Sequence, residues 1–182
     1  LAGIHNVYNT LAVVAALNEA GVELKKIAQY FYPFTGMGRR FQKVCEFNGI
    51  TVYDDYAHHP TEIKAALQAA ASKFGKENVV AVFQPHRFTR LQSLWKEFLT
   101  AFENAGRVIV TDVYAASEDS IEGINGENFA AELSCEYVSG NMQDVARKLM
   151  PSLKKGDVVI GLGAGTITNL GKELCKLETI LR

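Results

Sequence analysis

The sequence is poor in cysteine. Its 182 residues include only Cys45, Cys135 and Cys175, which are odd in number, lie far apart and form no CxxC pair. A disulfide framework or a zinc site normally needs cysteines that are even in number or closely spaced. We therefore expect three reduced thiols, as is usual in a cytosolic protein, and neither a disulfide framework nor a zinc site.

Signals for membranes and for nucleic acids are also missing. No apolar run approaches the ~20 residues that cross a bilayer, and no basic-then-apolar signal segment opens the chain. The formal net charge is −1, so the overall charge does not indicate a nucleic-acid binder. These absences predict a cytoplasmic protein without a membrane or nucleic-acid partner. The chain begins with Leu1 and not with Met, and we interpret it as part of a longer polypeptide.

What the sequence does contain is a regular alternation of strand-like and helix-like segments. Apolar residues make up 48% of the chain and charged residues 21%, as in globular proteins with a packed core. Hydrophobic periodicity predicts strands at 41–47, 50–53, 79–83, 107–111, 136–138 and 158–162, and helices at 5–20, 24–31, 61–74, 88–105, 128–133, 144–154 and 167–177. Strands that alternate with helices indicate right-handed crossovers and a parallel sheet. The predicted fold class is α/β, with a mostly parallel sheet behind a short helical segment.

The first two predicted strands form a hairpin. They are joined by Asn48-Gly49, a dipeptide that suits the positive φ angles of a type I′ turn, so the sheet gains one antiparallel edge strand. Residues 34–40, with two glycines and two arginines, are the predicted linker. We expect one domain at 36–182. The two helices of 1–35 are too small to bury their apolar faces alone.

The densest group of polar residues is the segment 54–60, Asp-Asp-Tyr-Ala-His-His-Pro, which follows the second strand. Polar groups at the carboxyl end of a strand lie where open α/β sheets bind ligands. One Asp could simply cap the helix that begins near Pro60, and adjacent histidines with carboxylates are also metal-ligand types. The third interpretation is recognition of a polar substrate by Tyr56 and His58, with Asp55 accepting hydrogen bonds from ribose hydroxyls.

A second polar segment, 83–90, follows the next strand along the chain. Arg87 and Arg90 are three residues apart and would share one face of a helix. Paired guanidinium groups suit a carboxylate or a phosphate, although a solvated surface pair is the alternative. Because both polar segments end strands of one sheet, we expect them to line a shared cleft.

Two weaker signals lie before these segments. Asn6 and Asn9, next to His5, lie one helical turn apart near a predicted helix start; they could cap the helix or bind the edge of a purine. Arg40 follows the glycine-containing linker and precedes a strand. It is either a solvated surface residue or a cation that reaches a phosphate.

Two further segments leave their roles open. The residues from Asp112 to Glu118 end another strand, and they could line the same cleft or cap a helix. The glycines at 161, 163 and 165 look like a phosphate loop, but they match neither the G-x-G-x-x-G pattern nor the Walker A pattern. A tight crossover turn is the interpretation that we favour for this loop.

Three segments in this order, Asp-Asp-Tyr-Ala-His-His-Pro (54–60), Phe-Gln-Pro-His-Arg-Phe-Thr-Arg (83–90) and Asp-Val-Tyr-Ala-Ala-Ser-Glu (112–118), resemble the Mur ligases of bacterial peptidoglycan synthesis. The resemblance covers the whole chain and is strongest to the branch that joins L-alanine to UDP-N-acetylmuramate. It implies the end of a central ATPase domain at about 1–35 and a C-terminal Rossmann-like domain at about 36–182. The reaction it implies is ATP-dependent amide formation through an acyl phosphate.

The resemblance also implies roles for single residues. Tyr56, His58, Arg87 and Arg90 resemble the group that receives the amino acid. The residues that resemble the nucleotide contacts are His5, Asn6, Asn9, Arg40 and Asp55. No Walker A loop is present, and the family's Mg²⁺ ligands lie upstream of the matching region, so no metal ligand and no catalytic residue is expected here. We therefore predict that these 182 residues alone have no ligase activity and bind ATP weakly at best.

Other functions remain as alternatives. A related ligase would add a recycled peptide in place of alanine; the Phe-Gln-Pro-His-Arg segment and Tyr56 favour alanine, by resemblance only. A free-standing nucleotide- or metabolite-binding module, or a His-Asp metal hydrolase, would use the same polar groups differently.

Overall fold

The computed structural model describes residues 4–33 and 37–181, and it divides the chain into two units, Leu1–Gly38 and Arg39–Arg182. Each unit is described by itself. The first contains α1 (Ile4–Glu19) and α2 (Leu24–Phe31), as the periodicity predicted. Gly21, at φ +84°, lies in the turn between them. Several large apolar side chains of α1 are exposed, including Val7, Tyr8 and Leu11.

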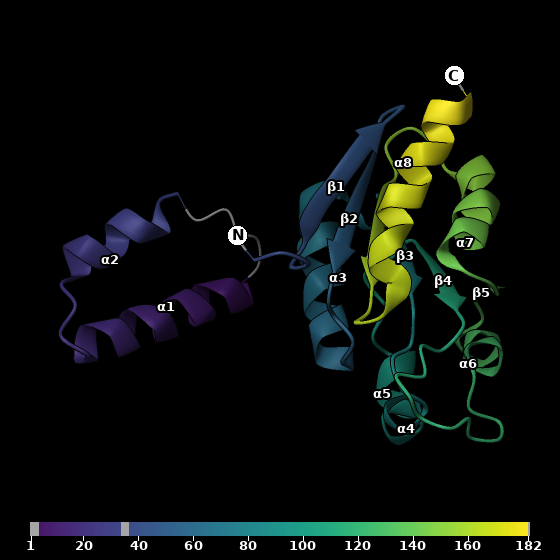
Figure 1. Ribbon diagram of the computed structural model, residues 1–182, viewed down its shortest axis with the longest axis horizontal. Coiled ribbons are helices and arrows are strands. Elements are labelled where there is room, and N and C mark those ends of the chain that lie inside the picture. Colours follow the sequence, from purple (N-terminus) through teal and green to yellow (C-terminus); the bar gives the residue numbers. More distant parts are fainter. Residues whose placement is uncertain (1–3, 34–36, 182) are drawn as a thin grey trace. The chain divides into compact units, whose positions relative to one another are not determined.

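The second unit is built on one six-stranded sheet (Figure 1). Its strands are β1 (Gln42–Phe47), β2 (Ile50–Asp55), β3 (Val79–Phe83), β4 (Arg107–Thr111), β5 (Glu136–Val138) and β6 (Val158–Leu162). The order across the sheet is β1-β2-β6-β3-β4-β5. Only β1 runs antiparallel to its neighbour, through the hairpin at Asn48 and Gly49, and the other pairs are parallel. The predicted fold class is confirmed.

Helices cover both faces of the sheet and create two apolar layers. One layer contains α3 (Pro60–Phe74), α4 (Phe88–Ser93), α5 (Trp95–Leu99) and α6 (Gly126–Leu133), which pack around Phe83 and Ile160. The other contains α7 (Met142–Leu149) and α8 (Leu170–Leu181), which pack around Val82 and Val159. Short 3₁₀ turns at Lys76–Asn78, Met150–Ser152 and Thr166–Asn169 complete the connections. Because β3 and β6 are buried on both faces, they read as continuous apolar runs.

Two predicted helices are shorter in the structure. The helix predicted at 88–105 is interrupted at Leu94, which has φ −115° and ψ 21°, and turns follow Leu99. Successive helical turns keep the same three- to four-residue spacing, so the apolar pattern could not reveal this break. The helix predicted at 144–154 is α7, which ends at Leu149 and continues as a 3₁₀ turn containing Pro151, a residue without a backbone N–H.

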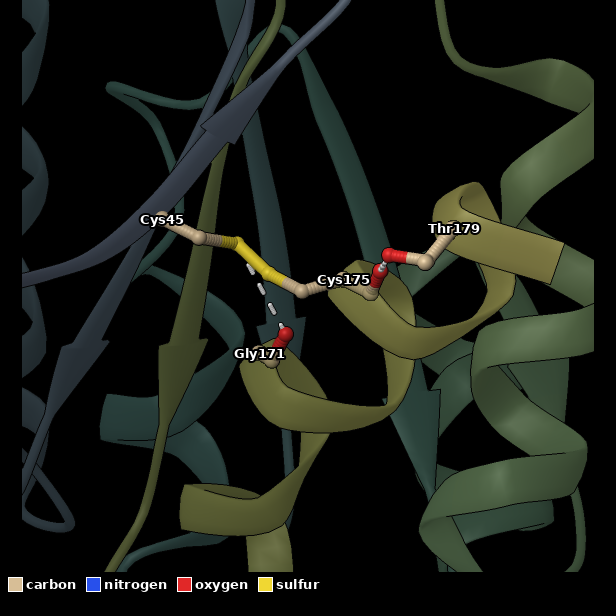
Figure 2. The surroundings of a disulfide bond; sticks show 4 residues. All are labelled: Cys45, Gly171, Cys175 and Thr179. Atoms are coloured by element: carbon tan, nitrogen blue, oxygen red, sulfur yellow. Dashed lines mark hydrogen bonds between the residues drawn. A yellow bond between two sulfur atoms is a disulfide. The ribbon is translucent and has the colours of Figure 1, made fainter. Parts of the chain in front are cut away.

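The expectation of three reduced thiols is wrong, because Cys45 and Cys175 form a disulfide between β1 and α8 (Figure 2). A Cβ at position 171 would lie 2.9 Å from Cγ1 of Val44, so Gly171 allows α8 to approach β1 closely. That approach brings Cys175, one turn after Gly171, next to Cys45. The two cysteines are 130 residues apart in sequence, and spacing along the chain could not reveal the contact. Cys135 is free, and burial raises the pKa of its thiol to about 11.

Among the residues that the structure describes, no helix is both long enough and apolar enough to cross a membrane.

Candidate functional site

The carboxyl ends of β2, β3, β4 and β6 meet at one edge of the sheet, which we call the carboxyl edge. Ligands of open α/β sheets bind outside this edge. The segment 54–60 leaves β2 here and the segment 84–90 leaves β3 here, with β6 lying between the two strands. Both polar segments of the sequence therefore reach the same edge.

A continuous series of ring contacts crosses this edge. The ring centroids of Tyr56 and His58 are 5.1 Å apart, and those of His58 and His86 are 6.0 Å apart. His86 stacks on Tyr114 at 5.5 Å. Its Nδ1 lies 3.0 Å from Nη1 of Arg90, which also donates to the His86 carbonyl at 3.1 Å. Tyr56, His58 and Arg90 are thus connected through a histidine that the sequence hypothesis did not include.

The electrostatic surroundings of His86 favour its neutral form. Burial lowers the pKa of His86 below its ordinary value, and the charges of Arg90 and His58 lower it further. An unprotonated Nδ1 can accept a hydrogen bond from the Arg90 guanidinium. The half-buried His86 is therefore suited to hold Arg90 at neutral pH.

Arg87 begins α4 in an unusual backbone conformation, with φ +72°. Its amide donates to the Tyr114 carbonyl at 2.9 Å, while its side chain is exposed and lies 4.0 Å from the Glu118 carboxylate. Glu118 accepts hydrogen bonds from the amide and hydroxyl of Thr89 at 3.1 and 2.7 Å. The hydroxyl of Thr89 is the main reason why the pKa of Glu118 is lowered. Glu118 therefore fixes the start of α4 beside the exposed Arg87 guanidinium.

Asp55 is buried and already has backbone partners. Its Oδ1 accepts from the Ala57 amide at 2.8 Å, and its Oδ2 accepts from the Phe41 amide at 2.8 Å. Burial raises the pKa of Asp55, while the two amide hydrogen bonds and the charge of Arg40 oppose this rise. Each carboxylate oxygen keeps a second lone pair that can accept another donor.

Arg40 is exposed and lies beside a carboxylate that the sequence hypothesis missed. Its Nη1 is 3.5 Å from Oε1 of Glu62 in α3. The same Glu62 accepts from the amide of His58 at 3.0 Å, and His59 and Glu62 form a capping box at the start of α3. Burial alone would raise the pKa of Glu62, but the His58 amide and the charges of His58 and Arg40 outweigh it and lower the pKa. The residue that caps α3 is thus His59, and not an Asp as the capping alternative for this segment had it.

The glycine loop after β6 is a tight turn, as favoured from the sequence. Gly163 has φ +145°, and a Cβ there would lie 2.7 Å from the Gln84 carbonyl. At Gly165 a Cβ would lie 2.6 Å from Oε1 of Gln84. The buried Gln84 side chain accepts from the Ile167 amide at 2.9 Å and donates to the Thr166 hydroxyl at 2.9 Å. The glycines therefore let the loop close on Gln84.

Asp112, whose role the sequence left open, turns toward β5. It accepts hydrogen bonds from the Tyr137 hydroxyl, from the Ser139 hydroxyl at 3.0 Å and from the Gly140 amide at 2.8 Å. Burial alone would raise its pKa, but these donors outweigh burial, and the pKa of Asp112 is lowered. Asp112 thus joins the β4 and β5 ends.

The remaining predicted nucleotide residues belong to the first unit. Asn6 and Asn9 both lie inside α1, three residues apart, so Asn6 does not precede the helix as a cap would. Asn9 is exposed and Asn6 is half-buried. The side chain of His5 lies outside the described part of the chain. Within that described part, no group of three or more His, Cys, Asp or Glu residues could hold a metal ion.

Comparison with known proteins identifies the family of the chain. A family model described as "Mur ligase, glutamate ligase domain" matches residues 39–165, which include β1, β2, β3, β4, β5 and β6. The chain belongs to the Mur ligase family. Both polar segments lie inside the matched residues.

Several Mur ligases match most of the chain. A UDP-N-acetylmuramate–L-alanine ligase of Caldicellulosiruptor bescii is 49% identical over 170 residues, and one of Desulfotalea psychrophila is 43% identical over 185 residues. They cover 91% and 96% of this chain, which spans only 37% and 39% of their lengths. The crystal structure of the UDP-N-acetylmuramate–alanine ligase of Thermotoga maritima superposes with a TM-score of 0.80 at 28% identity. The superposition covers 100% of this chain and 39% of the T. maritima chain.

Some of the polar residues at this Mur ligase edge escaped sequence reasoning. His86 lies in the polar segment 83–90. Its spacing of four residues from Arg90 is the signal that could have indicated their contact. Glu62 lies three residues after His59, which is the spacing of a capping box. Arg39 is one of the two arginines of the predicted linker, and nothing in the local sequence indicates its contacts.

Proposed function

We propose that this chain is the C-terminal part of an ATP-dependent ligase that joins L-alanine to UDP-N-acetylmuramate through an acyl phosphate. Residues 36–182 form its C-terminal domain, and residues 1–35 are the end of its central ATPase domain. The domain supplies the amino-acid site and part of the nucleotide site. The names of the relatives from C. bescii and D. psychrophila support this proposal.

One observation carries the amino-acid site: the connected series from Tyr56 through His58 and His86 to Arg90 at the carboxyl edge. In our proposal Arg87 and Arg90 hold the carboxylate of alanine, because a guanidinium group matches a carboxylate with two parallel hydrogen bonds. Tyr56 and His58 border the rest of the small substrate. The bound amine then faces the acyl phosphate, and the domain contributes to the rate by positioning.

We propose nucleotide contacts for each unit by itself. Asn6 and Asn9, with His5, bind the adenine; Arg40 approaches the phosphates; and Asp55 accepts from ribose hydroxyls through its remaining lone pairs. ATP is a substrate of the proposed reaction. We propose that the full enzyme also uses Mg²⁺, and in line with the family resemblance we assign no Mg²⁺ ligand to this chain. We propose a cytoplasmic location, as expected from the sequence. Disulfides are rare in the cytosol, so whether Cys45 and Cys175 are bonded in cells is a test of the proposed location.

The test compares the intact enzyme, with its upstream domains, and the isolated 182 residues. With ATP and UDP-N-acetylmuramate, the intact enzyme should release phosphate when L-alanine is added, and the isolated chain should release none. A tripeptide in place of alanine tests the related peptide ligase, and it should be a poor substrate. Turnover by the isolated chain, or a preference for the tripeptide, would contradict the proposal.

A further inference from the structure

Arg39 holds the first turn of the second unit against the end of β2. Its backbone lies in the left-handed region, with φ +58°. Its carbonyl accepts from the Tyr56 amide at 2.7 Å, and its amide donates to Oε1 of Gln42 at 2.8 Å. Non-glycine residues adopt this conformation only where their surroundings hold them in it. The contacts of Arg39 therefore connect the start of β1 with the end of β2.

The side chain of Arg39 extends these contacts to two strands. Its Nε lies 3.1 Å from Oδ2 of Asp54 in β2, and its Nη2 donates to the Gly163 carbonyl, after β6, at 2.7 Å. Asp54 is only 5% exposed, and the Thr168 hydroxyl donates to the same Oδ2 at 2.8 Å. Within the described residues, Oδ1 of Asp54 has no hydrogen-bond partner. Arg39 is thus the cation that compensates a buried carboxylate, and its guanidinium is held in one orientation.

The guanidinium held in this way faces the ring of Tyr56. The Cζ atom of Arg39 lies 4.8 Å from the ring centroid, closer than that of Arg40 at 5.8 Å. The ring meets His58 on another side, at 5.1 Å. A cation over the face of a tyrosine ring is attracted to it. Tyr56 is 37% exposed, so its orientation depends on these few neighbours.

We propose that Arg39 is a positioning residue of the amino-acid site. It acts through Tyr56, whose amide and ring it holds in register with β2 and β6, and it does not itself touch the substrate. The proposal rests on the proposed function for the identity of the substrate. Its geometric part, that Arg39 orients Tyr56, stands independently of that function.

The kinetic test uses the intact enzyme with Arg39→Met and Arg39→Lys. Arg39→Met keeps the aliphatic stem and removes the cation, so the KM for alanine should rise about tenfold, which corresponds to about 1.4 kcal/mol. The KM for ATP should change less than about twofold. Arg39→Lys keeps the charge but not the planar fork, and its KM should fall between those of wild type and Arg39→Met.

The matched control is Arg107→Met. Arg107 also connects separate elements, through Glu136 at 2.6 Å and Ser152 at 2.7 Å, but it begins β4 at the opposite edge of the sheet. It should lower the melting temperature without a change in either KM. If Arg39→Met behaves in the same way, Arg39 has only a structural role.

A double-mutant cycle identifies the route of the effect. If Arg39 acts through Tyr56, Arg39→Met should add nothing to the KM for alanine in a Tyr56→Leu background. Additive effects, or equal rises in the KM for alanine and for ATP, would overturn the proposal.

A spectroscopic readout separates this proposal from the proposed function. The tyrosines of the intact, unliganded enzyme, which include the seven of this chain, can be ring-labelled with ¹³C, and the Tyr56 signal assigned with Tyr56→Phe. Arg39→Met and Arg39→Lys should both shift the Tyr56 signal, with the larger shift for Met, and Arg107→Met should not. If wild type fails to use alanine but the shift appears, only the proposed function falls. If alanine is used and the shift is absent, the role of Arg39 falls.

Discussion

The carboxyl edge of the sheet has two halves with different contents. At the ends of β2, β3 and β6, the segments that follow the strands carry exposed or half-buried groups such as Tyr56, Arg87 and Arg90. At the end of β4, the Asp112 carboxylate accepts hydrogen bonds from Tyr137, Ser139 and Gly140. Its oxygens are therefore engaged by other groups of the protein. Both halves occupy the position where α/β sheets bind ligands. Position in the topology is therefore not sufficient evidence for a site.

Backbone conformation does not separate the two halves. Arg39, Phe41 and Arg87 border the first half, and all three have φ between +49° and +72°. Ala116 and Ser117, which follow Asp112 in the second half, have φ +50° and +69°. Such conformations cost about 1–3 kcal/mol each and persist where the surrounding structure imposes them. The exposed Arg87 and the half-buried Arg90 are therefore what distinguishes the first half.

The largest expected effect comes from Arg87→Ala in the intact enzyme. In the proposed site this charge holds the alanine carboxylate, and removing such a hydrogen-bonded charge costs about 1.5–3 kcal/mol, so the KM for alanine should rise roughly 10- to 100-fold. The KM for ATP should change far less, and Arg107→Ala at the opposite edge should change neither. Steady-state kinetics with each substrate varied in turn measures both constants. Equal rises in the two KM values would remove Arg87 from the amino-acid site.

Asp112→Asn tests the other half and should affect stability alone. The variant weakens hydrogen bonds to a charged acceptor, and because Asp112 is partly exposed we expect a loss of about 1–2 kcal/mol in the free energy of unfolding. Urea unfolding of the 182-residue chain measures it. Asp119→Asn is the control, since Asp119 is exposed and has no hydrogen-bond partner in the described part of the chain. In the intact enzyme, a raised KM for alanine in Asp112→Asn would contradict the division of the edge.

Much of this architecture could be predicted from the sequence because its signals are local. Alternating apolar runs gave every strand of the sheet, and Asn48-Gly49 gave the hairpin. Two polar segments that follow strands were enough to predict a common edge, because parallel strands end on the same side. The strand order could not be predicted, because the position of β6 between β2 and β3 depends on crossovers that no local pattern encodes.

The remaining features depend on contacts between distant parts of the chain. Arg39 contacts Gly163, which is 124 residues away, and Cys45 bonds Cys175, which is 130 residues away. The break at Leu94 keeps the helical spacing on both sides, so the pattern continues through it. Asp55 accepts from the amide of the nearby Ala57 and also from that of Phe41, which is 14 residues away, and the local sequence does not indicate the second contact.

The smallest expected effect is a difference in the pH dependence of unfolding between Asp55 and Asp112. The pKa of Asp112 is lowered in the folded state, so its contribution to stability is present above the ordinary carboxyl pKa of about 3.9 and is lost as the pH falls through the lower, folded value. The pKa of Asp55 is raised by burial, so its ionised form costs stability at neutral pH, and that cost is relieved as the pH falls through the raised value. The two carboxylates therefore have opposite pH linkage.

Urea unfolding of wild type, Asp55→Asn and Asp112→Asn between neutral and acidic pH measures this linkage. As the pH falls, the stability advantage of wild type over Asp112→Asn should shrink, because wild type loses what the carboxylate contributed. The stability of wild type relative to Asp55→Asn should instead rise, because the protonated acid resembles the amide. Slopes of the same sign for the two variants would show that both halves of the edge treat their carboxylates alike, and the distinction between them would then rest on the arginines alone.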